Sequence, residues 1–163
     1  MTERLYAKSV EELLSPAELA TMSGLDFIRG IVEGRLPAPP ISKTLNFWLE
    51  SAREGEAIFV GVPKFNAMNP IGSIHGGWFG TILDSCMACA FQTTLPKGKG
   101  YTTLEYKVNI IRPLLPGDAS YRATGRVDHA GRRTGVASGT LVGVEDGKTY
   151  ATGSTTCITL DVV

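Results

Sequence analysis

The chain has 163 residues, and its sixteen lysine and arginine residues balance its sixteen aspartate and glutamate residues. This balance argues against proteins that bind nucleic acid or a membrane surface, because such proteins normally carry a basic excess. The length favours one domain with a sizeable core. The N-terminus lacks an apolar signal core and no apolar run is long enough to span a membrane, so we expect a soluble, cytoplasmic protein.

The cysteines and histidines give no sign of metal or redox chemistry. Three cysteines are too few for a disulfide framework, and the C-x-x-C formed by Cys86 and Cys89 has no second pair of ligands beside it. We interpret these thiols as small core residues in a reducing compartment. The sequence contains only two histidines, His75 and His129, which excludes a histidine-rich zinc site. We therefore expect neither a metal nor a cofactor.

The first forty residues predict a helical arm. Ser15 to Glu18 form a capping box with a proline at the first helical position. Apolar residues from Leu25 to Val32 then recur at helical spacing, and Gly34 is a plausible stop. The prolines within 37–40 force an extended connector. We divide the chain into this arm with its connector, residues 1–40, and a main domain, residues 41–163.

From about residue 44 the pattern changes to strands. Two runs, 45–51 and 56–62, are separated by a short polar turn and predict a hairpin. After a glycine-rich loop, an apolar run from about 77 to 95 predicts a long helix that is buried on all sides. Four strand-like runs follow, at 101–112, 119–129, 133–144 and 148–161. These elements predict an α+β fold in which a curved antiparallel sheet of five to six strands wraps around one central helix.

The first strand after the helix carries alternating side chains. Apolar residues at even positions from Leu104 to Ile110 alternate with polar ones, which is typical of a half-buried antiparallel strand. The same alternation places Thr102 on the apolar side and Thr103 on the opposite side.

The most informative feature of the sequence is the glycine-rich loop that opens onto the predicted helix and its one acid, Asp84. A lone buried carboxylate is costly, so it is expected to have a partner, a shifted pKa or a chemical role. Gly76 and Gly77 stand at the helix start, where backbone N–H groups are free to meet a carbonyl oxygen or an anion. Together these are the parts of an acyl-transfer site.

These residues occur in an ordered set of motifs. The loop Asn69-Pro70-x-Gly72-x-x-His75-Gly76-Gly77, the acid Asp84 and the strand end Arg112-Pro113 together resemble the PaaI-like hotdog-fold acyl-CoA thioesterases. The resemblance covers roughly residues 45–160. It implies a hotdog fold and hydrolysis of acyl-CoA to a carboxylic acid and free CoA. It also implies a homodimer with active sites at the subunit interface, and a homotetramer is common in the family.

The resemblance implies a role for each motif residue. The N–H of Gly76 would polarise the thioester carbonyl, and Asp84 would attack that carbonyl or activate water. Asn69 and His75 match positions that help to hold substrate and water, and Thr103 matches a hydroxyl that orients the attacking water.

Each of these residues also has a structural interpretation. Asn69 before proline is a good turn former, His75 could cap the loop, and Gly76 could serve only close helix packing. Asp84 could be a buried structural acid, and β-propensity alone explains Thr103.

Four further residues are substrate-binding candidates: Gly77, Arg112, Arg132 and Arg133. The arginines lie at strand ends and in a turn, where such residues are mostly solvated. A guanidinium also pairs with phosphate through two parallel hydrogen bonds, which makes these side chains candidate anchors for the phosphates of CoA.

Helix geometry constrains how Gly76 and Asp84 can act together. Eight residues separate them, which at about 1.5 Å per residue places them roughly 12 Å apart along one helix. Catalytic contacts need about 3 Å, so both cannot touch one thioester from a single chain. The hypothesis therefore requires two chains, with Gly76 from one and Asp84 from the other.

Two other functions remain open from the sequence. A non-catalytic acyl-CoA binding or regulatory module would share the fold but has no need of a buried acid facing the thioester. A hotdog hydratase or dehydratase would present an acid and a histidine together. Here His129 follows Asp128, but late in a strand and remote from the glycine-rich loop.

Overall fold

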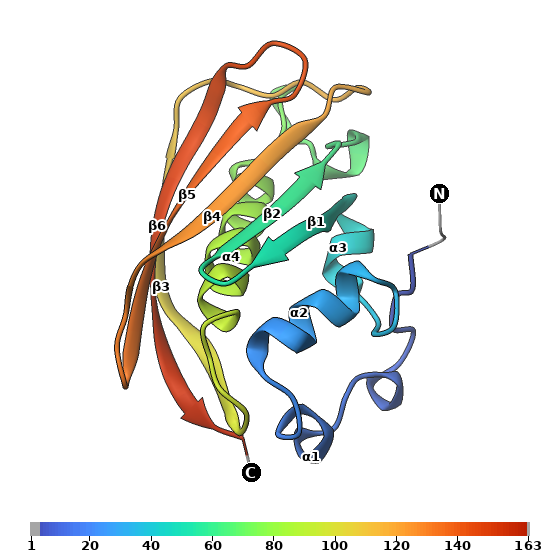
Figure 1. Cartoon of the computed structure of the whole chain (residues 1–163). Coiled ribbons are helices and arrows are strands. Elements are labelled where there is room, and N and C mark those ends of the chain that lie inside the picture. The colour runs from blue at the N-terminus through green and yellow to red at the C-terminus, as the bar shows by residue number, and fades with distance from the viewer. Residues whose placement is uncertain (1–3, 163) are drawn as a thin grey trace.

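The computed structural model describes residues 4–162 and contains one six-stranded antiparallel sheet that curves around a central helix (Figure 1). The sheet runs in the order β1-β2-β4-β5-β6-β3. The elements are β1 (Phe47–Arg53), β2 (Glu56–Gly61), α4 (Gly76–Gln92), β3 (Lys99–Ile110), β4 (Tyr121–Ala130), β5 (Thr134–Gly143) and β6 (Thr149–Asp161). The predicted α+β hotdog architecture is confirmed, including the hairpin between β1 and β2.

The helix α4 is the centre of the core. Most of its residues are buried, because strands of the curved sheet pack along it. It ends at Gln92, three residues before the predicted end at 95, because Thr93 and Thr94 lie in a turn and Leu95 precedes a proline. The Thr93 hydroxyl accepts a hydrogen bond from the Gly55 N–H at 2.8 Å, which ties this helix end to the β1–β2 turn.

Two glycines let the sheet approach α4 closely. A Cβ placed on Gly125 of β4 would lie 2.1 Å from the carbonyl oxygen of Cys86 in α4. A Cβ on Gly135 of β5 would lie 2.0 Å from the ring of Phe91. The absence of side chains at these positions therefore sets the distance between sheet and helix.

The arm precedes the sheet and has more helix than the sequence predicts. It consists of a 3-10 turn (Val10–Glu12), α1 (Pro16–Leu19) and α2 (Gly24–Val32), followed by α3 (Pro40–Thr44). The capping box at Ser15 is present, and Gly34 follows α2 in the left-handed region with φ of 72°. Pro40 begins α3 instead of extending the connector, because proline is well placed at the first position of a helix.

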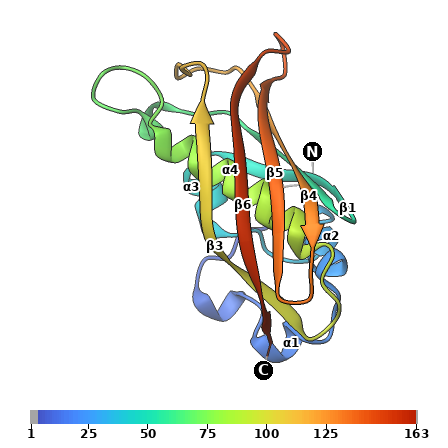
Figure 2. The same cartoon turned by 90° about the vertical axis from the view of Figure 1, so that its left-hand side faces the viewer.

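The arm lies on one side of the molecule only. α2 packs against β1 and α4 (Figure 1). Figure 2 shows the outer face of the sheet, which no helix of the described residues covers. Within residues 4–162, no helix is both long enough and apolar enough to cross a membrane.

A β-bulge in β3 makes one of the sequence expectations wrong. The register with β6 shifts between Thr103 and Glu105, so Leu104 interrupts the alternation of side chains. Thr103 consequently faces α4 and Thr102 is exposed, the reverse of the order that strict alternation predicts. After the bulge the even positions face the helix, since a Cβ on Gly80 would lie 3.0 Å from the Tyr106 hydroxyl.

The apolar face of β3 is also less buried than the sequence predicts. β3 is an edge strand, and Leu104, Tyr106 and Ile110 are 57%, 47% and 50% exposed. An edge strand with exposed apolar side chains is unusual for an isolated chain, because such edges promote pairing with other chains.

The close approach at Gly125 gives a direct test of the packing. We expect Gly125→Ala to lower the free energy of unfolding by about 1–3 kcal/mol, because the new methyl group meets helix backbone that cannot move aside. Urea denaturation would measure the change. Gly117→Ala is the matched control: no atom lies within 4 Å of its added Cβ, so its effect should stay within about 0.5 kcal/mol. Equal stability of the two variants would contradict this account of the packing.

Candidate active site

The glycine-rich loop before α4 is held together by the side chain of Asn69. Its Oδ1 accepts hydrogen bonds from the N–H groups of Ile71 (3.0 Å) and Ser73 (3.2 Å), and its Nδ2 donates to the Ser73 hydroxyl (2.8 Å). Gly72 adopts a φ of 91°, which the turn requires. Sequence reasoning missed Ser73, although an Asn and a Ser four residues apart in a turn are a recognisable hydrogen-bonding pair.

His75 forms the N-terminal cap of α4. Its Nδ1 accepts a hydrogen bond from the Gly77 N–H at 2.8 Å, so the neutral ring carries its proton on Nε2. The Gly77 N–H is thereby occupied. The Gly76 N–H has no acceptor among residues 4–162, and Gly76 is exposed. The loop therefore presents one free donor at the positive end of the helix dipole.

Asp84 lies just over two turns into the same helix and is half-buried. The Thr103 hydroxyl donates a hydrogen bond to its Oδ1 at 3.1 Å. Burial raises the pKa of the Asp84 carboxyl, and the hydrogen bond from Thr103 opposes this only in part. A carboxyl with a raised pKa is a better proton acceptor than an ordinary surface aspartate.

Sequence reasoning also missed Tyr101, which is close enough to Asp84 for the carboxylate charge to affect its phenol. Burial and the nearby Cys89 and Asp84 hold the pKa of its phenol well above the ordinary range. The sequence could have indicated Tyr101, because side chains two residues apart on a strand share a face and Tyr101 is two residues before Thr103.

The predicted residues form two separate groups within one chain. We call Asn69, His75, Gly76 and Gly77 the loop half-site, and Asp84 with Thr103 the acid half-site. The unbroken helix α4 holds Gly76 and Asp84 eight residues apart, which is about 12 Å along its axis. One chain therefore does not bring the free N–H donor and the carboxylate to a common substrate atom.

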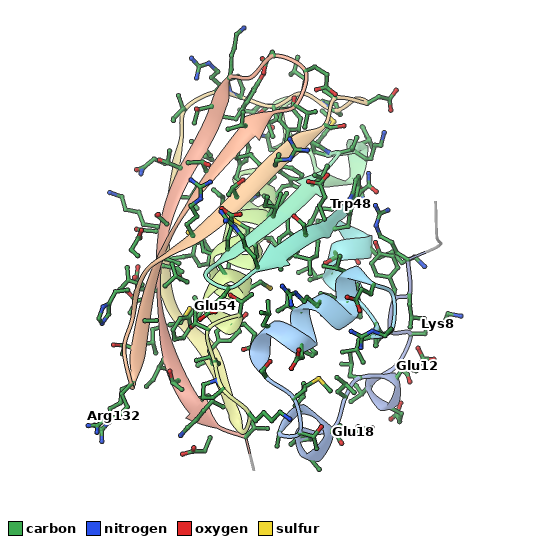
Figure 3. The ribbon with its side chains drawn as sticks, in the orientation of Figure 1. Lys8, Glu12, Glu18, Trp48, Glu54 and Arg132 are labelled. Carbon is green, nitrogen blue, oxygen red and sulfur yellow. The ribbon has the colours of Figure 1, made fainter. Side chains whose placement is uncertain are left out.

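The three candidate arginines are exposed and lie at opposite ends of the sheet. Arg112 donates a hydrogen bond to the carbonyl oxygen of Thr149, whereas the carbonyl oxygen of Arg133 accepts one from the N–H of Thr159. Thr149 and Thr159 are ten residues apart on β6, which corresponds to about 33 Å. Arg132 lies beside Arg133 at the end of the sheet (Figure 3). A single phosphate cannot contact both ends within one chain.

The cysteines of α4 are poor nucleophiles. Burial raises the pKa of the Cys86 thiol, and burial with the nearby charge of Asp84 raises that of Cys89 to about 12. Such thiols stay protonated, and the thiolate is the form that binds metal or attacks substrates. Among the described residues, no three His, Cys, Asp or Glu side chains are grouped as a metal site would require.

The Asp128–His129 pair does not join either half-site. Both residues are exposed on β4, and Asp128 accepts a hydrogen bond from the Ser138 hydroxyl at 3.0 Å. The structure therefore gives no observation that favours a hydratase.

Comparison with known proteins shows what this chain is similar to. The model of the thioesterase superfamily matches residues 71–150. Among solved structures, a phenylacetic acid degradation-related protein from Ralstonia eutropha JMP134 is 28% identical with a TM-score of 0.72, and the match covers 81% of this chain and 98% of that one. The PaaI protein of the E. coli phenylacetic acid degradation operon is 23% identical with a TM-score of 0.69, covering 76% and 86%.

A third structure, from Streptococcus mutans and bound to acetyl-CoA, is 23% identical with a TM-score of 0.65, and the match covers 72% of this chain and 90% of that one. No curated protein matches the chain. The family match and the shared fold confirm the resemblance to PaaI-like hotdog thioesterases, and they support thioester hydrolysis as the general activity.

The raised pKa of Asp84 predicts that this residue costs stability. A folded-state pKa above the ordinary value means that ionising Asp84 weakens the folded state as pH rises. We therefore expect Asp84→Asn to raise the free energy of unfolding at neutral pH by about 1 kcal/mol. The gain should shrink on acidification and vanish below the ordinary pKa of 3.8.

Thermal and urea unfolding at several pH values would measure this difference. The control is Asp128→Asn, which removes an exposed carboxylate and should change stability by less than about 0.5 kcal/mol. A loss of stability in Asp84→Asn at neutral pH would mean that the carboxylate is a structural acid.

Proposed function

We propose that the protein hydrolyses acyl-CoA thioesters as a homodimer, with each active site built from the loop half-site of one chain and the acid half-site of the other. One observation carries the proposal. The free Gly76 N–H and the raised-pKa Asp84 lie on one rigid helix, about 12 Å apart. In a dimer with a twofold axis, one chain would supply the N–H and the other the carboxylate to each thioester. The dimer would therefore contain two equivalent sites.

The proposed chemistry follows from the groups present. The thioester carbonyl accepts a hydrogen bond from the Gly76 N–H, which stabilises the negative charge that develops on this oxygen. Ionised Asp84 takes a proton from a water molecule held by Thr103, and the water oxygen attacks the carbonyl carbon. The carbon–sulfur bond then breaks, and the proton on Asp84 passes to the CoA sulfur.

A covalent route uses the same residues. Asp84 can attack the carbonyl itself, release CoA and form an anhydride that water then hydrolyses. Both routes need the carboxylate ionised, so both predict that activity falls on the acid side of the Asp84 pKa.

The exposed edge of the sheet supports the dimer. β3 presents partly exposed apolar side chains at Leu104, Tyr106 and Ile110, and Thr103 on this strand contacts Asp84. A second chain that covers this edge would come close to the acid half-site. The homotetramer and the cytoplasmic location stay predictions from the sequence.

The positions of the three candidate arginines limit how they could bind the phosphates of CoA. The separation of Arg112 from Arg132 and Arg133 means that the phosphates of one CoA meet only one of these two groups from a given chain. We assign no preference between them.

A thiol-release assay tests the proposed activity. We expect hydrolysis above the spontaneous rate for part of a panel that runs from acetyl-CoA through long-chain acyl-CoAs to phenylacetyl- and benzoyl-CoA. Asp84→Asn should lower kcat by about 10²–10⁴-fold, because the variant has no proton acceptor or nucleophile at this position. Full activity of the folded variant would refute the role of Asp84. A wild type that binds acyl-CoA without turnover would instead be the non-catalytic module.

The Gly76 donor can be removed without changing the loop. His75 has φ of −62° and ψ of 141°, a conformation that the residue before a proline favours, and position 76 begins the helix. Gly76→Pro therefore deletes the N–H, and we expect kcat to fall by about 10²–10³-fold. Gly76→Ala keeps the N–H, and its Cβ meets only the side chain of Ile110 at 3.4 Å. This control should retain most of the activity.

Mixing the two inactive variants distinguishes a shared site from a site within one chain. Refolding Asp84→Asn together with Gly76→Pro would give mixed dimers in which one site has both wild-type groups. Random pairing should restore roughly one quarter of wild-type activity. No recovery from mixed dimers would contradict the shared site, and their formation would be checked with differently tagged chains.

A further inference from the structure

A cavity of about 600 Å³ lies between the arm and the main domain. This volume falls in the range of about 300–1,000 Å³ that is usual for small-molecule sites. Its wall is mainly apolar, and its principal side chains are Leu19, Met22, Phe27, Ile28, Ile31 and Leu49. The arm supplies most of them, and the arm lies outside the stretch 71–150 that the thioesterase superfamily model matches.

The inner wall of this cavity belongs to the same elements as the acid half-site. Ser85, which follows Asp84 in α4, lines it together with Cys89. Tyr101, two residues before Thr103 in β3, lines it as well. The charge of Asp84 contributes to the raised pKa of both Cys89 and Tyr101, so these two side chains lie near the carboxylate and border the cavity at once.

We propose that this arm cavity holds the acyl group of the substrate, and that the group is an uncharged hydrocarbon chain or ring. The inference rests on the proposed thioesterase function, since it places the acyl group beyond a carbonyl at the acid half-site. An apolar wall favours such a group through burial of its surface. A charged acyl group is disfavoured, because Lys99 and Asp161, the charged side chains that line the cavity within residues 4–162, already pair with each other.

The position of α2 makes the arm the part of the chain that limits acyl size. Phe27, Ile28 and Ile31 are spaced along one face of this helix and line the cavity. Val32, the next residue along, does not line the cavity and is 37% exposed. Bulk added at Ile31 therefore enters the cavity, whereas bulk added at Val32 points away from it.

Chain-length profiles test the proposal. For the wild type we expect kcat/KM on straight-chain acyl-CoAs to rise about fourfold per methylene until the cavity is full. Ile31→Trp should lower the ratio of kcat/KM for decanoyl-CoA to that for acetyl-CoA by about tenfold or more, because the indole occupies the space of several methylenes. Ile31→Ala should move the optimum to longer chains.

Val32→Trp is the matched control. Its ratio of kcat/KM for decanoyl-CoA to kcat/KM for acetyl-CoA should equal that of the wild type. An unchanged ratio in folded Ile31→Trp would overturn the proposal, as would an equal change in Val32→Trp. Thermal unfolding would establish that each variant is folded, and Met22→Trp replaces Ile31→Trp if the latter is not.

A binding measurement separates this inference from the proposed function. Calorimetric titration with n-decanol, an uncharged chain without a thioester, probes the cavity directly. Binding that Val32→Trp keeps and Ile31→Trp loses would support the arm cavity even if no acyl-CoA were hydrolysed. No binding of n-decanol to the wild type, together with a flat chain-length profile, would overturn the inference while leaving hydrolysis itself intact.

Discussion

The contact between the inner face of the sheet and the backbone of α4 fixes where the candidate groups on this helix lie. Gly125 lets β4 lie close to the carbonyl oxygen of Cys86, since an added Cβ would be 2.1 Å from it, and most side chains of α4 are buried by the surrounding strands. Because Gly76 and Asp84 lie on one unbroken helix, they keep a constant separation. Under the proposed function, each group is therefore held in place to meet its counterpart from a second chain, as catalysis by preorganised groups requires.

The two half-sites are held together in different ways. The loop half-site depends on short-range hydrogen bonds, from Asn69 to Ser73 and from Gly77 to His75, which leave one N–H exposed at the helix end. The acid half-site depends on long-range packing, since Thr103 reaches Asp84 from a strand that follows the helix in the chain. The first group could form from local sequence alone, whereas the second exists only once β3 has paired with β6.

This difference decides how much could be predicted from the sequence. The elements, their approximate bounds and the capping role of His75 follow from local signals such as turn residues and hydrophobic periodicity. The bulge at Leu104 has no such signal, because it arises from pairing with β6, and it reversed the faces expected for Thr102 and Thr103. The family resemblance favoured Thr103 as the site hydroxyl, and the structure shows that Thr103 donates a hydrogen bond to Asp84. The arm cavity could not be predicted from the sequence, since it depends on how α2 packs against the main domain.

The arm is continuous in sequence and precedes every strand of the sheet. The part of the cavity wall that the arm supplies can therefore vary without altering the residues of the two half-sites. Under the functions proposed here, selection on substrate range and selection on the reaction act on different stretches of one gene. Such a division lets a lineage acquire new substrates through changes near the N-terminus while the catalytic groups stay constant.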